Sequence, residues 1–174
     1  MTMIPDGKDW TWVIERRCPE CGFDAGTVDY EQISAIVRDN ADQWIPVLQR
    51  SDVRVRPNAR TWSPLEYAAH VRDVFDIFAV RLQMMIDEDD PLFENWDQDA
   101  TAVDERYNEQ DPAAVTHELV ESAGRVARAF GAVPAADRGR TGRRSNGSRF
   151  TVDSLARYFV HDPIHHLHDV GVPR

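Results

Sequence analysis

Lysine and cysteine are scarce in this sequence, and negative charge is in excess. Lys8 is the only lysine among 20 basic residues, and 30 acidic residues bring the formal net charge to −10. Because proteins that bind duplex DNA or RNA neutralise phosphates with Lys and Arg, a nucleic-acid partner is disfavoured. The two cysteines are too few for the disulfide framework of a small secreted protein, so a reducing compartment is expected.

Long apolar runs are missing as well. No stretch approaches the roughly 20 apolar residues that a membrane helix needs, and residues 1–12 lack the charged-then-apolar pattern of a signal peptide. We therefore expect a cytoplasmic protein without a membrane partner. The chain has 174 residues, of which 42% are hydrophobic, and this is enough for one domain with a single core.

Apolar residues recur at helical spacing in four segments, and each segment opens with a residue that favours a helix start. The best start signal is a capping box with a proline at the first helical position. The pattern predicts an all-α bundle over residues 29–174, preceded by an irregular extension over residues 1–28. The four start signals are Asp29, Ser63-Pro64-Leu65-Glu66, Asp111-Pro112 and Thr151.

Two connections carry candidate substrate contacts. Residues 91–110 form a long polar connection, which in a compact bundle is often functional, and we expect it to cover a site with Trp96. Residues 138–149 hold five arginines around Asn146-Gly147, a dipeptide that suits a tight hairpin turn. Because the guanidinium fork binds carboxylates, Arg143 is a second candidate contact to a substrate; a solvated surface hairpin is the alternative.

The histidines are concentrated near the end of the chain, where four of the six fall within residues 161–168. At about 100° per residue, His161, His165 and His168 share one helical face, whereas His166 points away. The i, i+4 spacing of His161 and His165 is suited to gripping one metal ion. Pro163 between them argues against a regular helix at this point.

A third ligand is expected from another helix, and His70 is the candidate, with His168 as a substitute for one of the others. Helix bundles commonly build metal sites from side chains on facing helices. Three neutral histidines with an open position are typical of a catalytic rather than a structural metal site. The predicted ligand set is therefore His70, His161 and His165, with Asp73, Asp162 or Asp169 as outer hydrogen-bond acceptors.

The motifs around these histidines resemble those of the DinB/YfiT-like family, which includes mycothiol-dependent maleylpyruvate isomerase. One histidine follows Trp62-Ser63-Pro64 in a long helix, and His-x-x-x-His lies in the final helix within residues 157–170. The resemblance covers residues 29–174. It implies a four-helix bundle with up-down-down-up topology that binds Zn or Ni through three side chains, here His70, His161 and His165.

The resemblance also implies a chemistry. Characterised members of the family use the metal to bind and activate mycothiol or bacillithiol, so a thiol S-transferase or isomerase acting on a small molecule is the first hypothesis. Water in place of the thiol would favour metal-assisted hydrolysis. A metal-binding interaction module without turnover, related to stress or forming a homodimer, is the hypothesis from another class.

Cys18 and Cys21 form a Cys-x-x-Cys that suits half of a zinc ribbon or a redox pair. A structural zinc needs four ligands, and the sequence contains no second cysteine pair. Three roles therefore stay open for this pair: a thiol turn that supports the extension, a redox pair, or a metal shared across a dimer.

Overall fold

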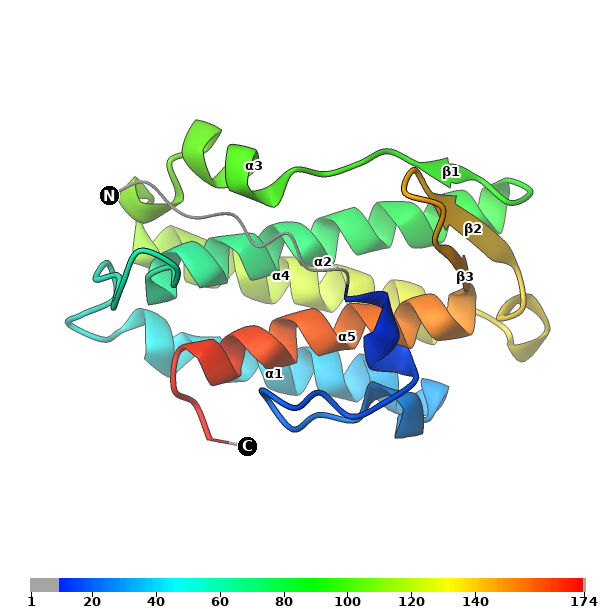
Figure 1. Ribbon diagram of the computed structural model, residues 1–174, viewed down its shortest axis with the longest axis horizontal. Helices are drawn as coiled ribbons and strands as arrows, with labels where there is room; N and C mark the ends of the chain where they lie inside the picture. The colour runs from blue at the N-terminus through cyan, green and yellow to red at the C-terminus, as the bar shows by residue number, and fades with distance from the viewer. Residues whose placement is uncertain (1–9, 174) are drawn as a thin grey trace.

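Four long helices dominate the structure, a computed structural model that describes residues 10–173 (Figure 1). The first nine residues of the predicted extension lie outside the described part. The long helices are α1 (Ile33–Leu48), α2 (Pro64–Asp87), α4 (Pro112–Gly131) and α5 (Val152–Asp169). The smaller elements are α3 (Gln98–Asp104), β1 (Leu92–Phe93), β2 (Thr141–Arg144), β3 (Arg149–Thr151) and five short 3₁₀ turns at Thr11–Ile14, Ala25–Thr27, Tyr30–Gln32, Tyr107–Glu109 and Ala135–Asp137.

The directions of the helices confirm the predicted all-α, four-helix bundle. In Figure 1, α1 and α5 run one way along the bundle, while α2 and α4 run the other way. The long connection between α2 and α4 brings the chain back along the bundle, so these two helices are parallel. Along the chain the four long helices therefore run up, down, down and up. Each of α4 and α5 packs against both α1 and α2.

The predicted start signals cap the helices. The Ser63 hydroxyl accepts a hydrogen bond from the Glu66 amide at 3.2 Å, and the Glu66 carboxylate accepts one from the Ser63 amide at 2.9 Å. Asp111 caps α4 and Thr151 caps α5, whereas Asp29 caps a short 3₁₀ turn just before α1. These bonds satisfy amide groups that have no partner inside a helix, so they fix where each helix begins.

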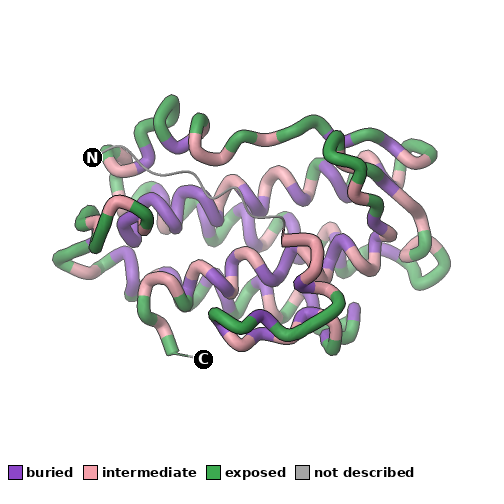
Figure 2. The backbone as a smooth tube through the Cα atoms, in the orientation of Figure 1, coloured by how far each residue is buried: buried purple, intermediate pink, exposed green. Residues whose placement is uncertain are grey.

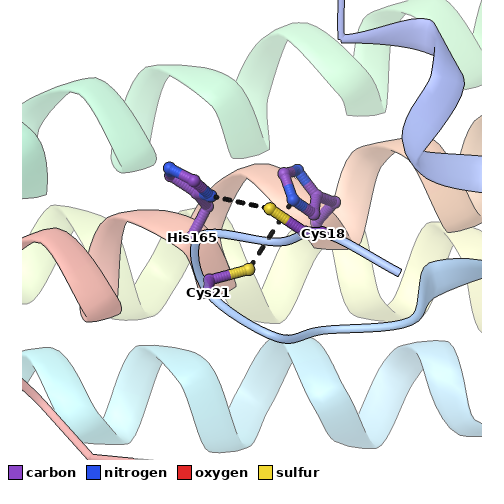
Figure 3. Close-up of side chains that lie close together, drawn as sticks. Cys18, Cys21 and His165 are labelled. Atoms are coloured by element: carbon purple, nitrogen blue, oxygen red, sulfur yellow. Dashed lines mark hydrogen bonds between the residues drawn. The ribbon is translucent and has the colours of Figure 1, made fainter. Parts of the chain in front are cut away.

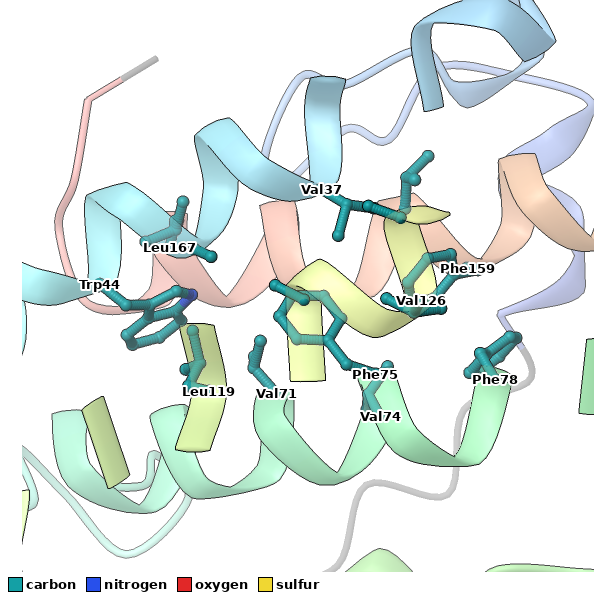
Figure 4. Packing of buried hydrophobic residues seen from close by; sticks show 14 of the residues in the cluster. Val37, Trp44, Val71, Val74, Phe75, Phe78, Leu119, Val126, Phe159 and Leu167 are labelled. Atoms are coloured by element: carbon teal, nitrogen blue, oxygen red, sulfur yellow. The ribbon is translucent and has the colours of Figure 1, made fainter. Parts of the chain in front are cut away.

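The core lies between the four helices, whose inward faces are buried (Figure 2). Phe159 of α5 stacks on Phe78 of α2, with ring centroids 4.9 Å apart (Figure 4), and on Phe130 of α4, with centroids 5.4 Å apart. Because one aromatic side chain of α5 contacts both opposite helices, core packing fixes how far α5 can rotate about its axis.

Pro163 does not interrupt α5, which is continuous from Val152 to Asp169. The buried Asn40 of α1 donates a hydrogen bond to the Pro163 carbonyl at 2.9 Å and accepts one from the Trp44 indole at 3.2 Å. The expectation that Pro163 argues against a regular helix is therefore wrong for this segment. Asn40 of α1 makes a polar contact with α5 at this turn.

The arginine-rich segment forms the predicted hairpin. β2 and β3 pair antiparallel, and Gly147 at their turn has a φ of 93°, which glycine adopts without strain. β1 adds a parallel strand at the edge of β2. Within residues 10–173, no helix is both long and apolar enough to cross a membrane.

The N-terminal segment runs beside α5 (Figure 1) and contacts it through its 3₁₀ turns. A tight loop closes at Cys18, whose amide donates to the Phe23 carbonyl at 2.8 Å and whose carbonyl accepts from the Gly22 amide at 2.9 Å. Gly22 has a φ of 73°, which this turn needs and a side chain would disfavour. Both cysteines of the loop are buried.

Replacing Asn40 with alanine should destabilise the bundle by about 1–3 kcal/mol, because it leaves the buried Trp44 indole without its hydrogen-bond acceptor. Urea unfolding monitored by circular dichroism measures the change. Asp42→Ala on the exposed face of the same helix is the control and should change the stability little. Equal stability of the two variants would contradict this role of Asn40.

Candidate functional site

The last helix carries two overlapping pairs of potential metal ligands. His161 and His165 are four residues apart, and so are Asp162 and His166. Because the second pair is shifted by one residue, it is rotated by about 100° around the helix axis. The two pairs therefore face different neighbours, and each meets ligands from another part of the chain.

The first group, here called the Cys2His2 cluster, joins His161 and His165 to Cys18 and Cys21. One ligand atom from each of the four lies within 4.8 Å of the others, and all four residues are buried. The Cys18 sulfur lies 3.7 Å from His165 Nδ1, and the Cys21 sulfur lies 3.7 Å from His161 Nε2 (Figure 3). The Trp10 ring covers both imidazoles, with centroid distances of 5.5 and 4.9 Å.

The second group, here called the His70 cluster, joins His70 of α2 to Asp162 and His166 of α5. Asp162 Oδ1 lies 3.3 Å from His70 Nε2 and 3.6 Å from His166 Nε2. Both ring nitrogens of His70 and the Asp162 Oδ1 atom are buried, and within the described residues none has a hydrogen-bond partner. Buried polar atoms are rarely left in this state, so the cluster is suited to a ligand.

Electrostatics set the protonation states that metal ligation requires. Burial lowers the pKa of His161 to about 4, and burial also lowers the pKa of His165, so both rings are neutral at pH 7. Burial acts to raise the pKa of Asp162, but the neighbouring His166 and His70 outweigh it and hold this pKa below its usual value. The carboxylate is therefore ionised beside His70.

The structure divides the predicted set of His70, His161 and His165 between the two clusters. His161 and His165 do share a face, as their spacing predicts, but that face meets the cysteines rather than His70. His70 meets Asp162 and His166. The geometry therefore favours two ligand sets in place of one.

His168 is exposed and belongs to neither cluster. Sequence reasoning placed His166 away from the site, because it treated the face of His161 as the one that meets His70. The i, i+4 spacing of Asp162 and His166 was the signal that could have found the second set. The sequence also contained a signal for the first set: the Cys-x-x-Cys pair and the His161–His165 pair together offer the four ligands that a structural zinc ion needs.

Trp96 lies over the His70 cluster, where its ring stacks on His70 with centroids 5.2 Å apart and planes 6° apart. Its indole donates a hydrogen bond to the Thr101 hydroxyl at 2.9 Å, which holds the ring in place. The connection that carries Trp96 thus covers the imidazole, as expected of residues 91–110. Arg143 lies in the hairpin, where its guanidinium forms an ion pair with Asp90 at 2.9 Å, and it belongs to neither cluster.

A buried arginine that sequence reasoning did not single out lies on the same side of α2 as His70, three helical turns further on. The Arg81 guanidinium lies over the Phe78 and Phe93 rings and reaches the Glu94 carbonyl at 3.4 Å. Burial, with a smaller contribution from the Arg144 charge, lowers the pKa of Arg81 to about 10.

The sequence profile of the DinB superfamily matches residues 35–170, which include all three residues of the His70 cluster. The chain belongs to the DinB superfamily. The matched range starts after Cys18 and Cys21, so the cysteine half of the Cys2His2 cluster lies outside the DinB profile.

A solved structure of similar fold is that of YfiT from Bacillus subtilis, described as a probable metal-dependent hydrolase with an unusual four-helix bundle topology. It superposes with a TM-score of 0.70 at 16% identity, over 98% of this chain and 91% of that one. At this identity, the likeness shows the DinB-type fold. No curated protein matches the sequence.

The metal-free protein should lose stability in mild acid. Because the pKa of His161 is about 4 in the folded chain and 6.5 in the unfolded one, the unfolded chain takes up the proton first as the pH falls. This stability is complete above pH 6.5 and declines towards pH 4, by about 3 kcal/mol. Urea unfolding in the presence of a chelator, across this pH range, measures the decline.

The matched variants for this test are His161→Gln, which should flatten the decline, and His117→Gln, an exposed histidine, which should not. A stability that stays constant between pH 6.5 and 4 in the wild type would show that His161 titrates normally in the folded chain.

Proposed function

We propose that the His70 cluster holds one divalent cation and that the protein is a metal-dependent enzyme whose reaction is hydrolysis of a small-molecule substrate. The observation that carries the proposal is the group of buried ligand atoms in this cluster that lack hydrogen bonds. A buried polar atom with no hydrogen bond costs up to about 1–3 kcal/mol, and the ion-pair contact of His70 Nε2 with Asp162 Oδ1 at 3.3 Å offsets part of this cost here. A bound cation would offset this cost.

The donor set and its spacing fit such a cation. Two histidines and one carboxylate, with further positions open, form the ligand set of many catalytic metal sites. Ligand distances near 2.1 Å around a tetrahedral ion imply nitrogen–oxygen separations of about 3.4 Å. The observed separations of 3.3 and 3.6 Å bracket that value. Zn and Ni both accept this donor set.

The surrounding residues orient the ligands. His166 Nδ1 lies 2.8 Å from Asp169 Oδ2, and donation of its proton to that carboxylate puts the lone pair of the ring on Nε2, which lies 3.6 Å from Asp162 Oδ1. Carboxylates that hold the second nitrogen of a ligand histidine in this way fix its tautomer and raise its basicity. The rings of Trp96 and Trp62 pack against His70 and limit the access of water from that side.

A divalent cation supplies Lewis-acid chemistry at such a site, because it lowers the pKa of a coordinated water or thiol. The chain itself supplies two imidazoles, an ionised carboxylate and an apolar cover. The function thus proposed agrees with the description of YfiT as a probable metal-dependent hydrolase.

Transfer of a low-molecular-weight thiol such as mycothiol or bacillithiol is the other reaction that the family resemblance implies. It uses the same open metal position and the same three ligands. Assays of ester, amide and phosphoester substrates, each with and without added thiol, separate hydrolysis from S-transfer. Activity that depends strictly on thiol would favour the transferase and contradict hydrolysis.

Replacing His166 with alanine should remove one equivalent of metal per chain from protein loaded with Zn or Ni and then dialysed. Asp169→Asn should weaken metal binding by about 10–100-fold without removing a ligand. Competition with a chromophoric chelator measures both effects. His168→Ala, an exposed histidine of the same helix, is the control and should bind metal like the wild type.

Hydrolytic activity in any assay that the wild type passes should disappear with His166→Ala and persist with His168→Ala. Full metal content in the His166 variant would contradict the ligand assignment. Unchanged activity in a variant that has lost this metal would contradict the proposed function.

A further inference from the structure

We propose that Cys18, Cys21, His161 and His165 form a second metal centre, a structural zinc site that fastens the N-terminal segment to α5. The site has four ligands of its own, and the proposal does not rest on the reaction proposed at the His70 cluster. Its cysteine ligands lie outside the range that the DinB profile matches.

The geometry of the four ligand atoms matches a tetrahedral zinc ion. Zinc–sulfur distances near 2.3 Å and zinc–nitrogen distances near 2.1 Å imply sulfur–nitrogen separations of about 3.6 Å. Both observed separations, from Cys18 to His165 and from Cys21 to His161, are 3.7 Å. One ligand atom of each residue lies within 4.8 Å of all the others, so a single ion can contact all four.

The backbone presents these ligands in two rigid pairs. The loop that closes at Cys18, with Gly22 at positive φ, brings both sulfurs to the side that faces α5. The helix brings His161 and His165 together through their i, i+4 spacing. Two pairs that are separately fixed and meet at ligand distance are the usual construction of a structural zinc site.

The surroundings of His165 fit ligation through Nδ1. Its other nitrogen, Nε2, lies 3.5 Å from a carboxylate oxygen of Glu20 and 3.7 Å from one of Asp169. A carboxylate beside the second nitrogen of a ligand histidine holds the tautomer that leaves the first nitrogen free for the metal. Glu20 lies between the two cysteines in the sequence, so the same loop supplies ligands and their support.

Four protein ligands leave no position for a substrate, and burial under Trp10 separates the cluster from solvent. Both features are typical of structural rather than catalytic zinc. The site would hold the face of α5 that carries His161 and His165 against the N-terminal loop. The adjacent pair, Asp162 and His166, is thereby kept facing His70.

The test uses the full-length protein, loaded with Co²⁺ in place of Zn²⁺. Thiolate ligation should give sulfur-to-cobalt charge-transfer absorption in the near ultraviolet, together with the intense visible bands of tetrahedral Co²⁺. His166→Ala should keep these bands, because it removes only the other site. Cys18→Ser combined with Cys21→Ser should lose them, and should lose one equivalent of zinc per chain.

A readout of structure accompanies the spectra. Trypsin should cut the chain after the exposed Arg16 and Arg17 several-fold faster once the metal is removed, because the segment is no longer held on α5. His168→Ala is the control and should match the wild type in both measurements.

Absence of thiolate bands from folded wild-type protein supplied with excess Co²⁺ would overturn the proposal, as would a Cys18–Cys21 disulfide in protein purified under reducing conditions. The wild-type spectrum decides the matter even if the double cysteine variant does not fold. A wild-type protein that holds only the cysteine-bound metal, with the same metal content in His166→Ala, would count against the proposed function and leave this site intact.

Discussion

The rotation of α5 about its own axis is the constraint on which both clusters depend. One residue along a helix corresponds to about 100°, so His161 and His165 face the N-terminal loop only when Asp162 and His166 face α2. Packing of Phe159 against α2 and α4, and the hydrogen bond from Asn40 to the Pro163 carbonyl, hold the helix at this rotation. A small rotation would separate both ligand sets at once.

The two clusters differ in the number of ligands that they offer to an ion. The Cys2His2 cluster has four buried potential ligands, enough to complete a tetrahedral ion, whereas the His70 cluster has three and would leave further positions of an ion to water or a substrate. Burying these polar side chains lowers the free energy of unfolding of the metal-free chain, because buried polar atoms without hydrogen bonds lose their contacts with water and gain none in return. Metal binding would therefore contribute to folding as well as to chemistry.

The sequence was sufficient to predict the bundle, because start signals such as Ser63-Pro64 and the helical spacing of apolar residues act locally. The pairing of His161 with His165 followed from spacing alone. Their partners did not, because which face of α5 meets α2 is decided by tertiary packing around Phe159 and not by the helix itself. The cysteine pair seemed incomplete for the same reason: its other two ligands lie more than 100 residues away.

The central claim is that one helix supplies ligands to two distinct metal ions. Anomalous diffraction at the zinc edge, from a crystal of the zinc-loaded full-length chain, tests it most directly. We expect two peaks per chain, one among Cys18, Cys21, His161 and His165 and one among His70, Asp162 and His166. A single peak bound jointly by His70, His161 and His165 would contradict it.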